Sequence, residues 1–306
     1  MKNLKNFTST ISTSEGNYVK ILNGPGTNKL INFNTKKAYI EHDSIAENIE
    51  ATTDGDFKLT SNGKELNWNV STGKLLDICT IKLSQQNTYK GSKDNINPIV
   101  ELSLDEYMYL LGMKATKDIK DKARKRVKRD LEILYNLSIE WKEKSKKRVK
   151  DFVKIRIATR CQFLKGTILF SFSPEMASYL TNAYLMRYPL DLLKLPERNE
   201  NTFVLGRKLA LHSSNNNNIK RGTANIIGVK ALLAVCKSIP SYEEVKRGNR
   251  AFDARIKAPF ERALNALPFI NWEYCNSKKR ALTAEQLEFK DFNTFLTIFI
   301  KFEMKS

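Results

Sequence analysis

Helical periodicity marks the start of a folded module near Leu75. The run from Leu75 to Gln86 (LLDICTIKLSQQ) is amphipathic and predicts a helix. A longer helix is expected to begin at a cap formed by Thr116-Lys117-Asp118 and to end near Asn136, because apolar residues recur there every three or four positions. These apolar residues are Ile119, Ala123, Val127, Leu131 and Leu134. We therefore expect one face of this helix to be buried.

Strands and shorter helices surround these two helices. Ser103-Leu104-Asp105-Glu106 is a capping box and predicts a helix from Leu104 to near Gly112. Ser173-Pro174-Glu175 opens a further helix, with proline where a missing amide costs nothing. The predicted strands cover residues 99–102, 139–144, 152–160 and 167–172, the middle pair being joined by a basic hairpin. Helix, strand, helix, helix and basic hairpin is the order of a winged helix.

The second half of the chain repeats this order. Its predicted elements are a helix at 203–212, a polar loop at 213–218, a strand at 224–227, a helix at 229–236, a capping box at Ser241–Glu244, and wing strands at 272–276 and 295–302. The buried face of its long helix is marked by Phe252, Ile256, Phe260, Ala263 and Leu267. Pro259 removes a helical hydrogen bond and is expected to kink or split this helix.

Residue detail favours an internal duplication. Leu131-x-x-Leu134 followed by Ile139-x-Trp141 corresponds to Leu264-x-x-Leu267 followed by Ile270-x-Trp272. The two tryptophans, at 141 and 272, lie 131 positions apart, which is the length of a domain. The sequence therefore predicts an α+β fold with two tandem winged-helix domains related by duplication.

The first 70 residues have a different texture, rich in Asn, Thr, Ser and Gly. We expect an N-terminal extension of short strands, hairpins or partial disorder at 1–70, then winged-helix domains at 71–190 and 191–306. The segment Gly24-Pro25-Gly26-Thr27-Asn28-Lys29 lacks the Gly-Lys-Ser/Thr of a phosphate-binding loop and is expected to be a turn.

Charge points to a polyanionic partner. The chain has 52 Lys and Arg against 33 Asp and Glu, a net charge of +19. Between Lys114 and Lys150, fifteen basic residues face six acidic ones, so nearly half of the excess lies in one region. A helix with one apolar and one cationic face suits the major groove of DNA, and nucleic acid is the leading partner.

The candidate DNA-binding residues follow the two long helices and their hairpins. In the first module they are Lys117, Lys120, Arg124, Lys125 and Lys128 on the helix and Lys146, Lys147 and Arg148 at the hairpin tip. In the second they are Arg247, Arg250, Arg255 and Lys257, then Lys278, Lys279 and Arg280. Arg124 is the leading candidate for base reading, because arginine can bind guanine through two hydrogen bonds. The hairpin cations would approach phosphates or a minor groove.

Catalysis is not expected. His42 and His212 are solitary, and His212 is interpreted as a cationic helix cap. Asp54-Gly55-Asp56 is interpreted as a turn, and no carboxylate cluster has the spacing of a two-metal site. Four cysteines without a CxxC pair are expected to be reduced, packed thiols. We expect no catalytic residues, no metal, no cofactor, no membrane segment, and a cytoplasmic protein.

Three stretches resemble a known family. SLDEYMYLLG, RVKRDLEILYNLSIEW and IPSYEEVKRGNRAFDARIKAPFERALNAL are similar to plasmid replication initiators built from two tandem winged helices, the Rep proteins. The resemblance covers about residues 70–306. It implies that the helices at Lys117–Leu134 and Arg250–Leu267 enter the major grooves of directly repeated origin sites. It also implies dimer and monomer forms, with the first module supplying the dimer contact.

The main hypothesis is thus a sequence-specific double-stranded DNA-binding protein that acts as a plasmid or mobile-element replication initiator. It would bind repeated origin sites, help to open adjacent DNA, and recruit a host replicative helicase or initiator. One alternative is a winged-helix transcriptional repressor or partition-type DNA binder. Another is an RNA-binding or nucleic-acid-processing enzyme.

Overall fold

The computed structural model describes most of the chain between Thr10 and Lys305. The described ranges are 10–13, 17–31, 39–42, 48–52, 57–62, 68–87, 96–144, 150–236, 238–248, 251–283, 285–287 and 291–305. The chain divides into two compact units. Unit 1 comprises Met1–Thr13 and Lys20–Leu185, and unit 2 comprises Ser14–Val19 and Met186–Ser306. A two-stranded sheet is formed by β1 (Tyr18–Asn23) and β10 (Tyr184–Pro189).

The described helices of unit 1 are α1 (Pro25–Ile31), α2 (Val70–Asn87), α3 (Leu104–Leu110), α4 (Lys117–Asn136) and α5 (Pro174–Thr181). Helices α3, α4 and α5 begin where the sequence predicts their caps, whereas the helix predicted from Leu75 already begins at Val70. The side chain of Ser103 accepts a hydrogen bond from the amide of Glu106 at 3.0 Å, and Thr116 accepts one from Ile119 at 3.4 Å. Ser173 accepts from Met176 at 3.0 Å. These caps satisfy amides that a helix leaves without intrahelical partners.

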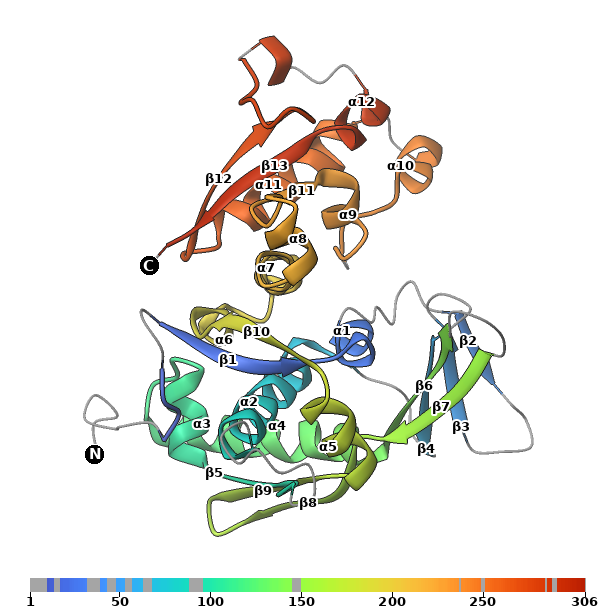
Figure 1. Ribbon diagram of the computed structural model, residues 1–306. Helices are drawn as coiled ribbons and strands as arrows, with labels where there is room; N and C mark the ends of the chain where they lie inside the picture. The colour runs from blue at the N-terminus through green and yellow to red at the C-terminus, as the bar shows by residue number, and fades with distance from the viewer. Residues whose placement is uncertain are drawn as a thin grey trace. The chain divides into compact units, whose positions relative to one another are not determined.

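The apolar face predicted for α4 is confirmed. Ala123, Val127, Leu131 and Leu134 are all buried, while Ile119 is half-buried. Figure 1 shows α3 and α4 grouped with α2, and α2 is buried over most of its length. The core of unit 1 therefore lies between these helices and the sheets that flank them.

The turn expected at Gly24–Lys29 is wrong, because the helix α1 begins at Pro25. Proline is favoured at a first helical position, where its fixed φ suits the helix. Gly24 precedes it at a close approach: a Cβ there would lie 2.6 Å from the ring of Tyr179. Gly24 thus serves packing and not a phosphate loop.

Two antiparallel sheets complete unit 1. The five-stranded sheet has the order β2 (Tyr39–His42), β3 (Asn48–Thr52), β4 (Phe57–Asn62), β6 (Leu137–Lys144), β7 (Lys150–Arg156). The three-stranded sheet has the order β5 (Ile99–Ser103), β9 (Thr167–Phe172), β8 (Ala158–Leu164). Because Leu59 of β4 pairs with Ile139 of β6, β2 to β4 belong to the sheet of unit 1 and not to a separate extension ending at residue 70.

The single strand expected at 152–160 is divided between these sheets. β7 ends at Arg156 and pairs with β6, whereas β8 begins at Ala158 and pairs with β9. Ile157 lies between them, fully buried, and its amide donates to the carbonyl of Leu137 at 3.1 Å. The chain changes sheets at this residue, which an uninterrupted β-pattern in the sequence cannot reveal.

Unit 2 is built on one three-stranded antiparallel sheet. Its order is β11 (Ile226–Gly228), β13 (Phe299–Met304), β12 (Ile270–Cys275). Its helices are α6 (Asp191–Lys194), α7 (Glu200–Ser213), α8 (Asn216–Lys220), α9 (Val229–Leu233), α10 (Tyr242–Gly248), the π-helix η2 (Asp253–Lys257), α11 (Ala258–Asn265), the 3-10 helix η3 (Glu285–Leu287) and α12 (Phe292–Leu296). The strand expected at 295–302 is wrong in its first part, because Asp291 caps α12 and the strand starts at Phe299.

The split predicted at Pro259 is confirmed. The long helix divides into η2 and α11, and Pro259 is the second residue of α11. The widened π-turns lie directly before the residue that lacks an amide donor. Every residue predicted for the apolar face, from Phe252 to Leu267, is buried. The capping box before α10 is also present, with Ser241 and Glu244 bonded to each other's backbone amides.

Close packing in unit 2 requires a glycine inside α7. A Cβ at Gly206 would lie 2.5 Å from Leu192 and 2.7 Å from Leu267. Glycine is unfavourable inside a helix, so this position is set by the approach of neighbouring side chains.

Both units repeat one topology. In each three-stranded sheet the first strand of the module pairs with its last, and the last with its middle strand, giving β5-β9-β8 and β11-β13-β12. A helix precedes the first strand, α2 or α7, and a long helix precedes the middle strand. The fold is therefore α+β with two tandem winged-helix domains, as predicted.

The tryptophan repeat matches two strands that are not equivalent. In sheet order the counterpart of β12, which holds Trp272, is β8, whereas Trp141 lies in β6 of the other sheet. The hairpin β6–β7 is inserted between α4 and β8 in unit 1. The correspondence of Ile139-x-Trp141 with Ile270-x-Trp272 thus reflects two strands that each follow a long helix.

Candidate nucleic-acid interface

The surface of α4 opposite its buried face is cationic. Lys117, Arg124, Lys125 and Lys128 are exposed on this surface, and Lys120 is half-buried. The helix carries 20 residues, so at 1.5 Å per residue it is about 30 Å long. It is long enough to place several of these cations along one groove of a duplex.

On α4, two of the predicted DNA-binding cations have carboxylate partners. Nζ of Lys120 lies 2.8 Å from Oδ1 of Asp105, and Nη1 of Arg124 lies 2.6 Å from Oδ1 of Asp121. The Arg124 and Asp121 side chains are both about half exposed, at 49% and 51%, so solvent screens their attraction. Arg124 can therefore exchange Asp121 for a base edge or a phosphate at small cost.

A buried carboxylate fixes α4 against the start of α2. Asp130 is fully buried, and its carboxylate accepts hydrogen bonds from Ser71 Oγ at 2.7 Å and Thr72 Oγ1 at 3.0 Å. Arg129 Nη2 donates to Asp130 Oδ1 at 2.9 Å and to Ser71 Oγ at 2.6 Å. We call these four residues the polar pin. They set the rotation of α4, and hence the direction in which its cations point.

Sequence reasoning missed the polar pin. The available signal was a carboxylate at position 130, three residues after Val127 and next to Leu131, on the side of the helix predicted to be apolar. A buried carboxylate requires partners, because leaving it unpaired costs several kcal/mol or more. The identity of those partners, about 58 residues away, could not be deduced from sequence spacing.

The hairpin tip predicted to carry Lys146, Lys147 and Arg148 lies outside the described residues. By topology, the hairpin of the winged helix in unit 1 is β8–β9. Its tip is formed by Leu164, Lys165 and Gly166, with φ of 48° at Lys165 and 83° at Gly166. Leu164 is 64% exposed and Lys165 is exposed. Lys165 is therefore a cation at the wing that the sequence analysis did not select.

In unit 2 the predicted cations separate into three places. Arg255 is exposed on η2, and Lys257, on the same π-helix, lies 4.0 Å from Asp253. Arg247 is in α10 but its side chain is not described, and Arg250 lies outside the described residues. Lys278, Lys279 and Arg280 are exposed in the turn after β12.

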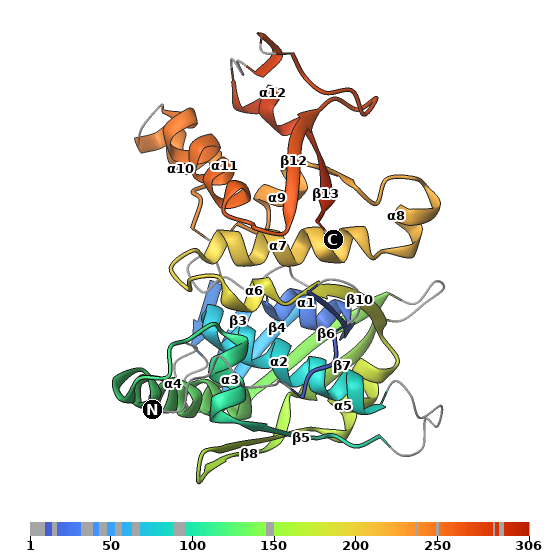
Figure 2. The same cartoon turned by 90° about the vertical axis from the view of Figure 1, so that its left-hand side faces the viewer.

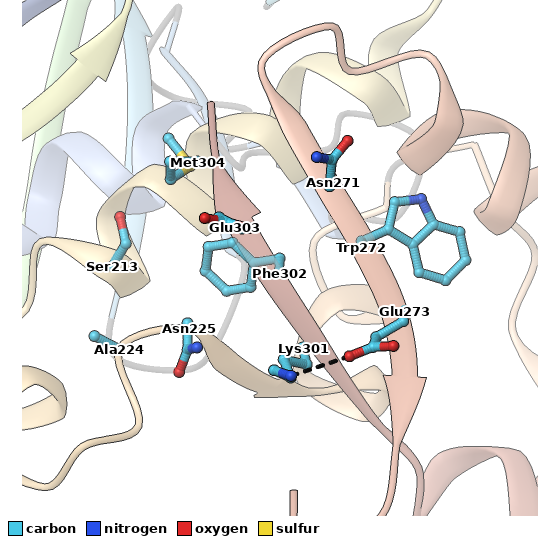
Figure 3. Close-up of a pocket in the computed structure, with 10 residues that line it drawn as sticks. All are labelled: Ser213, Ala224, Asn225, Asn271, Trp272, Glu273, Lys301, Phe302, Glu303 and Met304. Carbon is cyan, nitrogen blue, oxygen red and sulfur yellow. Dashed lines mark hydrogen bonds and ion pairs between the residues drawn. The ribbon is translucent and has the colours of Figure 1, made fainter. Parts of the chain in front are cut away.

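An open pocket of about 470 Å³ lies on the sheet of unit 2. Figure 3 shows its lining, in which Lys301 and Glu273 form an ion pair of 3.1 Å. The lining residues are Ser213, Ala224, Asn225, Asn271, Trp272, Glu273, Lys301, Phe302, Glu303 and Met304. The paired charges of Lys301 and Glu273 offset each other, and Glu303 adds a further carboxylate to the lining.

His212 has a structural role that differs from the predicted cationic cap. Its Nε2 lies 2.7 Å from the carbonyl of Ile226 and 3.0 Å from that of Thr223, and Asn218 Nδ2 approaches Nδ1 at 3.1 Å. Burial lowers the pKa of His212, against the opposing effect of the two carbonyls. The neutral ring, with a proton on Nε2, fits all three contacts and ties α7 to the loop before β11.

The cysteines are free thiols, as the sequence predicts. Cys79, Cys236 and Cys275 are buried, and Cys161 is half-buried. Burial raises the pKa of Cys161 to about 12, which keeps it protonated. In the described ranges, no group of three or more His, Cys, Asp or Glu side chains could hold a metal ion. Every helix within those ranges is too short or too polar to cross a bilayer.

Comparisons with known proteins agree with this architecture. A family model described as "Initiator Replication protein, WH1" matches residues 56–192. The crystal structure of the Pi initiator protein in complex with iteron DNA has a TM-score of 0.51 and 9% identity, covering 96% of this chain and 99% of that chain. Domains 2 and 3 of RctB give a TM-score of 0.48 and 9% identity, covering 91% and 98%. No curated protein sequence matches the chain.

The match begins at residue 56, inside the segment predicted as an extension, and so includes β4 together with α2 to α5 and β5 to β10, but not β2 and β3. The fold of the Pi initiator extends the likeness over both units. The resemblance predicted from three short stretches is thus confirmed as a match: residues 56–192 match the first winged-helix domain of initiator replication proteins, and the whole chain has a tandem winged-helix fold like that of the Pi initiator.

Proposed function

We propose that this protein is a replication initiator that binds directly repeated double-stranded DNA sites through its two winged helices. The observation that carries the proposal is α4: in a domain that matches the initiator family, a helix with a mostly buried apolar side presents exposed cations on its other side. A major groove admits such a helix, and its phosphates attract the cations.

Each cation on α4 has a role in this proposal. Arg124 reads a base through its guanidinium, while Lys117, Lys125 and Lys128 contact phosphates and fix the register. In unit 2, Arg255 and Lys257 take the corresponding positions on η2. The Pi initiator was crystallised with iteron DNA, which supports repeated sites as the class of ligand.

Further steps belong to the same proposal. After binding, the protein would open adjacent DNA and recruit a host helicase or initiator, and it would form a homodimer through unit 1. It would act without enzymatic activity of its own, in the cytoplasm. A metal-dependent nicking assay on supercoiled DNA tests this last point, since accumulation of nicked circles would contradict it.

Footprinting on the DNA that flanks the encoding gene is the decisive experiment. We expect protection of repeated sites, with the binding constant falling by about 0.9 log units per phosphate contact for each tenfold rise in salt and roughly 6 to 10 contacts in total. Transformation of a plasmid carrying the protected sites, with and without the protein, separates an initiator from a repressor or partition protein. Repeats that bind the protein but never support replication would favour the repressor.

A further inference from the structure

Two turns of unit 2 that are far apart in sequence are joined by a lysine. Nζ of Lys279, in the turn after β12, donates to the carbonyl of Gly222, in the turn after α8, at 2.8 Å. The residues are 57 positions apart. The contact brings together five cations: Lys220, Arg221, Lys278, Lys279 and Arg280, which we call the clasp surface. All five are exposed.

The conformation of both turns is closely determined. Oδ1 of Asn276 accepts hydrogen bonds from the amides of Lys278 at 2.9 Å and Arg280 at 3.1 Å, which closes the second turn. Lys279 has φ of 67°, a region that residues other than glycine seldom adopt. Gly222 has φ of 64°. Such backbone geometry persists only where surrounding contacts impose it, so the lysine is directed toward Gly222.

The clasp surface lacks compensating negative charge. The segments 215–222 and 276–280 contain no carboxylate. Among the described residues, Lys220, Arg221, Lys278 and Arg280 have no ion-pair partner, in contrast to Lys120 and Arg124 of α4. Cations gathered in this way repel one another, and a polyanion relieves that repulsion.

The position of the clasp surface separates it from the helix expected to read bases. In Figure 2, α8 lies on one side of β12 and β13, whereas α10 and α11 lie on the other. Exposed Asn216 and Asn217 beside the cations add amide donors, which also bind phosphate oxygens. The Lys279 ammonium has three N–H donors; one donates to Gly222, and two remain available to phosphate oxygens.

We propose that the clasp surface binds the sugar–phosphate backbone of duplex DNA outside the groove entered by η2 and α11. This inference rests on the proposed function. Lys278, Lys279 and Arg280 are already expected to approach phosphates, and the bond from Lys279 to Gly222 adds Lys220 and Arg221 to the same contact. Lys279 contacts a phosphate and also positions the other cations, because its bond to Gly222 holds the two cationic turns against the same stretch of DNA backbone.

The test is the salt dependence of binding to the repeated site. Replacing both Lys220 and Arg221 by glutamine should lower the slope of log K against log salt by about 1.8, the value for two phosphate contacts. Between 50 and 200 mM salt this variant should lose about twelvefold less affinity than the wild type. Hydroxyl-radical footprinting should show lost protection at the flank and unchanged protection at the centre.

Matched controls isolate position from charge. Replacing Arg198 and Lys305 by glutamine removes the same charge from exposed sites elsewhere in unit 2 and should leave the flanking protection intact. Gly222→Ala removes no charge but strains the turn and should weaken the flanking protection. Gly222→Asn should retain it, because asparagine adopts positive φ more readily. Equal protection in these two glycine variants would overturn the role of the clasp.

A second pair of substitutions covers a failure to fold. If Lys220→Gln with Arg221→Gln lowers the melting temperature, Lys278→Gln with Arg280→Gln makes the same test on the other turn. Absence of wild-type binding to any flanking repeat would contradict the proposed function itself. A folded clasp variant that binds the repeated site with the wild-type slope of log K against log salt and full flanking protection would overturn this inference alone. Normal DNA binding with loss of replication would also overturn it and would indicate an acidic protein partner.

Discussion

The two long helices that precede the middle strand of each module are held in different ways. In unit 1, α4 is a continuous helix fixed by the polar pin, where a buried carboxylate receives directional hydrogen bonds. In unit 2, η2 and α11 meet between Lys257 and Ala258, just before Pro259, and pack against aromatic rings around Phe295. Ring centroids of Phe252, Phe260 and Tyr274 lie 5.4, 6.0 and 6.1 Å from that of Phe295.

This difference shows that one topology can hold its long helix either by hydrogen bonds or by aromatic packing. A polar pin specifies rotation, because hydrogen bonds fail when their geometry changes. An aromatic cluster supplies more burial and constrains rotation less, which suits a helix interrupted by a π-turn and a proline. We therefore expect the orientation of α4 in unit 1 to depend on a few polar atoms, and that of η2 and α11 in unit 2 to depend on the volume of the packed aromatic side chains.

The largest effect is expected from the aromatic cluster. Phe295 is fully buried, so Phe295→Ala should lower the free energy of unfolding by about 3–5 kcal/mol. Chemical denaturation of the whole chain measures this value, and hydrogen exchange should show faster exchange in η2 and α11. Phe295→Leu fills most of the space and is the control. A loss below about 1 kcal/mol for the alanine variant would mean that burial does not hold this helix.

The polar pin should be nearly as sensitive. Asp130→Ala removes the buried carboxylate that accepts from Ser71, Thr72 and Arg129, leaves Ser71 and Thr72 only Asn69 as a side-chain acceptor, and should cost about 3 kcal/mol. Asp130→Asn keeps one acceptor oxygen and should cost less. Asp121→Ala removes an exposed carboxylate from the same helix and should change stability by less than about 1 kcal/mol. Equal stability of the Asp130→Ala and Asp121→Ala variants would show that the pin is dispensable.

DNA binding should separate two neighbouring cations of α4. Arg124→Ala should lose about 1–3 kcal/mol on the specific site and relax preference at one base pair. Lys125→Ala should weaken specific and random DNA alike and reduce the salt slope by about 0.9. Binding titrations on both DNAs at several salt concentrations give the comparison. If the two variants behave identically, α4 does not present Arg124 to a base.

The smallest effect concerns pH and unit 2. Because the pKa of His212 is lowered in the folded state, the unfolded chain binds more protons near that pKa. The contribution of His212 is therefore fully present above the unfolded value of 6.5 and is lost as pH falls through the folded pKa. Melting at pH 8 and pH 5 should show this loss, and His212→Gln should remove it. An unchanged pH dependence in that variant would assign the effect to other groups.

Local signals predicted the helices of this protein well. The caps at Ser103, Thr116, Ser173 and Ser241 depend on residues within three positions of each other, and Pro259 acts on its own turn. Sequence spacing carries this information directly. The fold class followed from the order of such elements.

Contacts between distant segments could not be predicted in the same way. The pairing of β4 with β6 joins Leu59 to Ile139, and the pin joins Ser71 to Asp130. The bond from Lys279 to Gly222 spans a similar separation. Each depends on how the chain returns on itself, so the sequence predicted cationic helices but not which cations are paired, pinned or gathered.

Gly206 has a consequence for how this protein can change over generations. The residue occupies a helix position where alanine would ordinarily stabilise by about 1 kcal/mol, yet any side chain there meets Leu192 and Leu267. Random mutagenesis followed by selection for folded protein should therefore deplete replacements of Gly206. A compensating exchange would have to shrink both leucines together, and two simultaneous changes are far rarer than one. The neighbouring side chains therefore restrict this helix position to glycine, although the residue has no part in the proposed DNA binding.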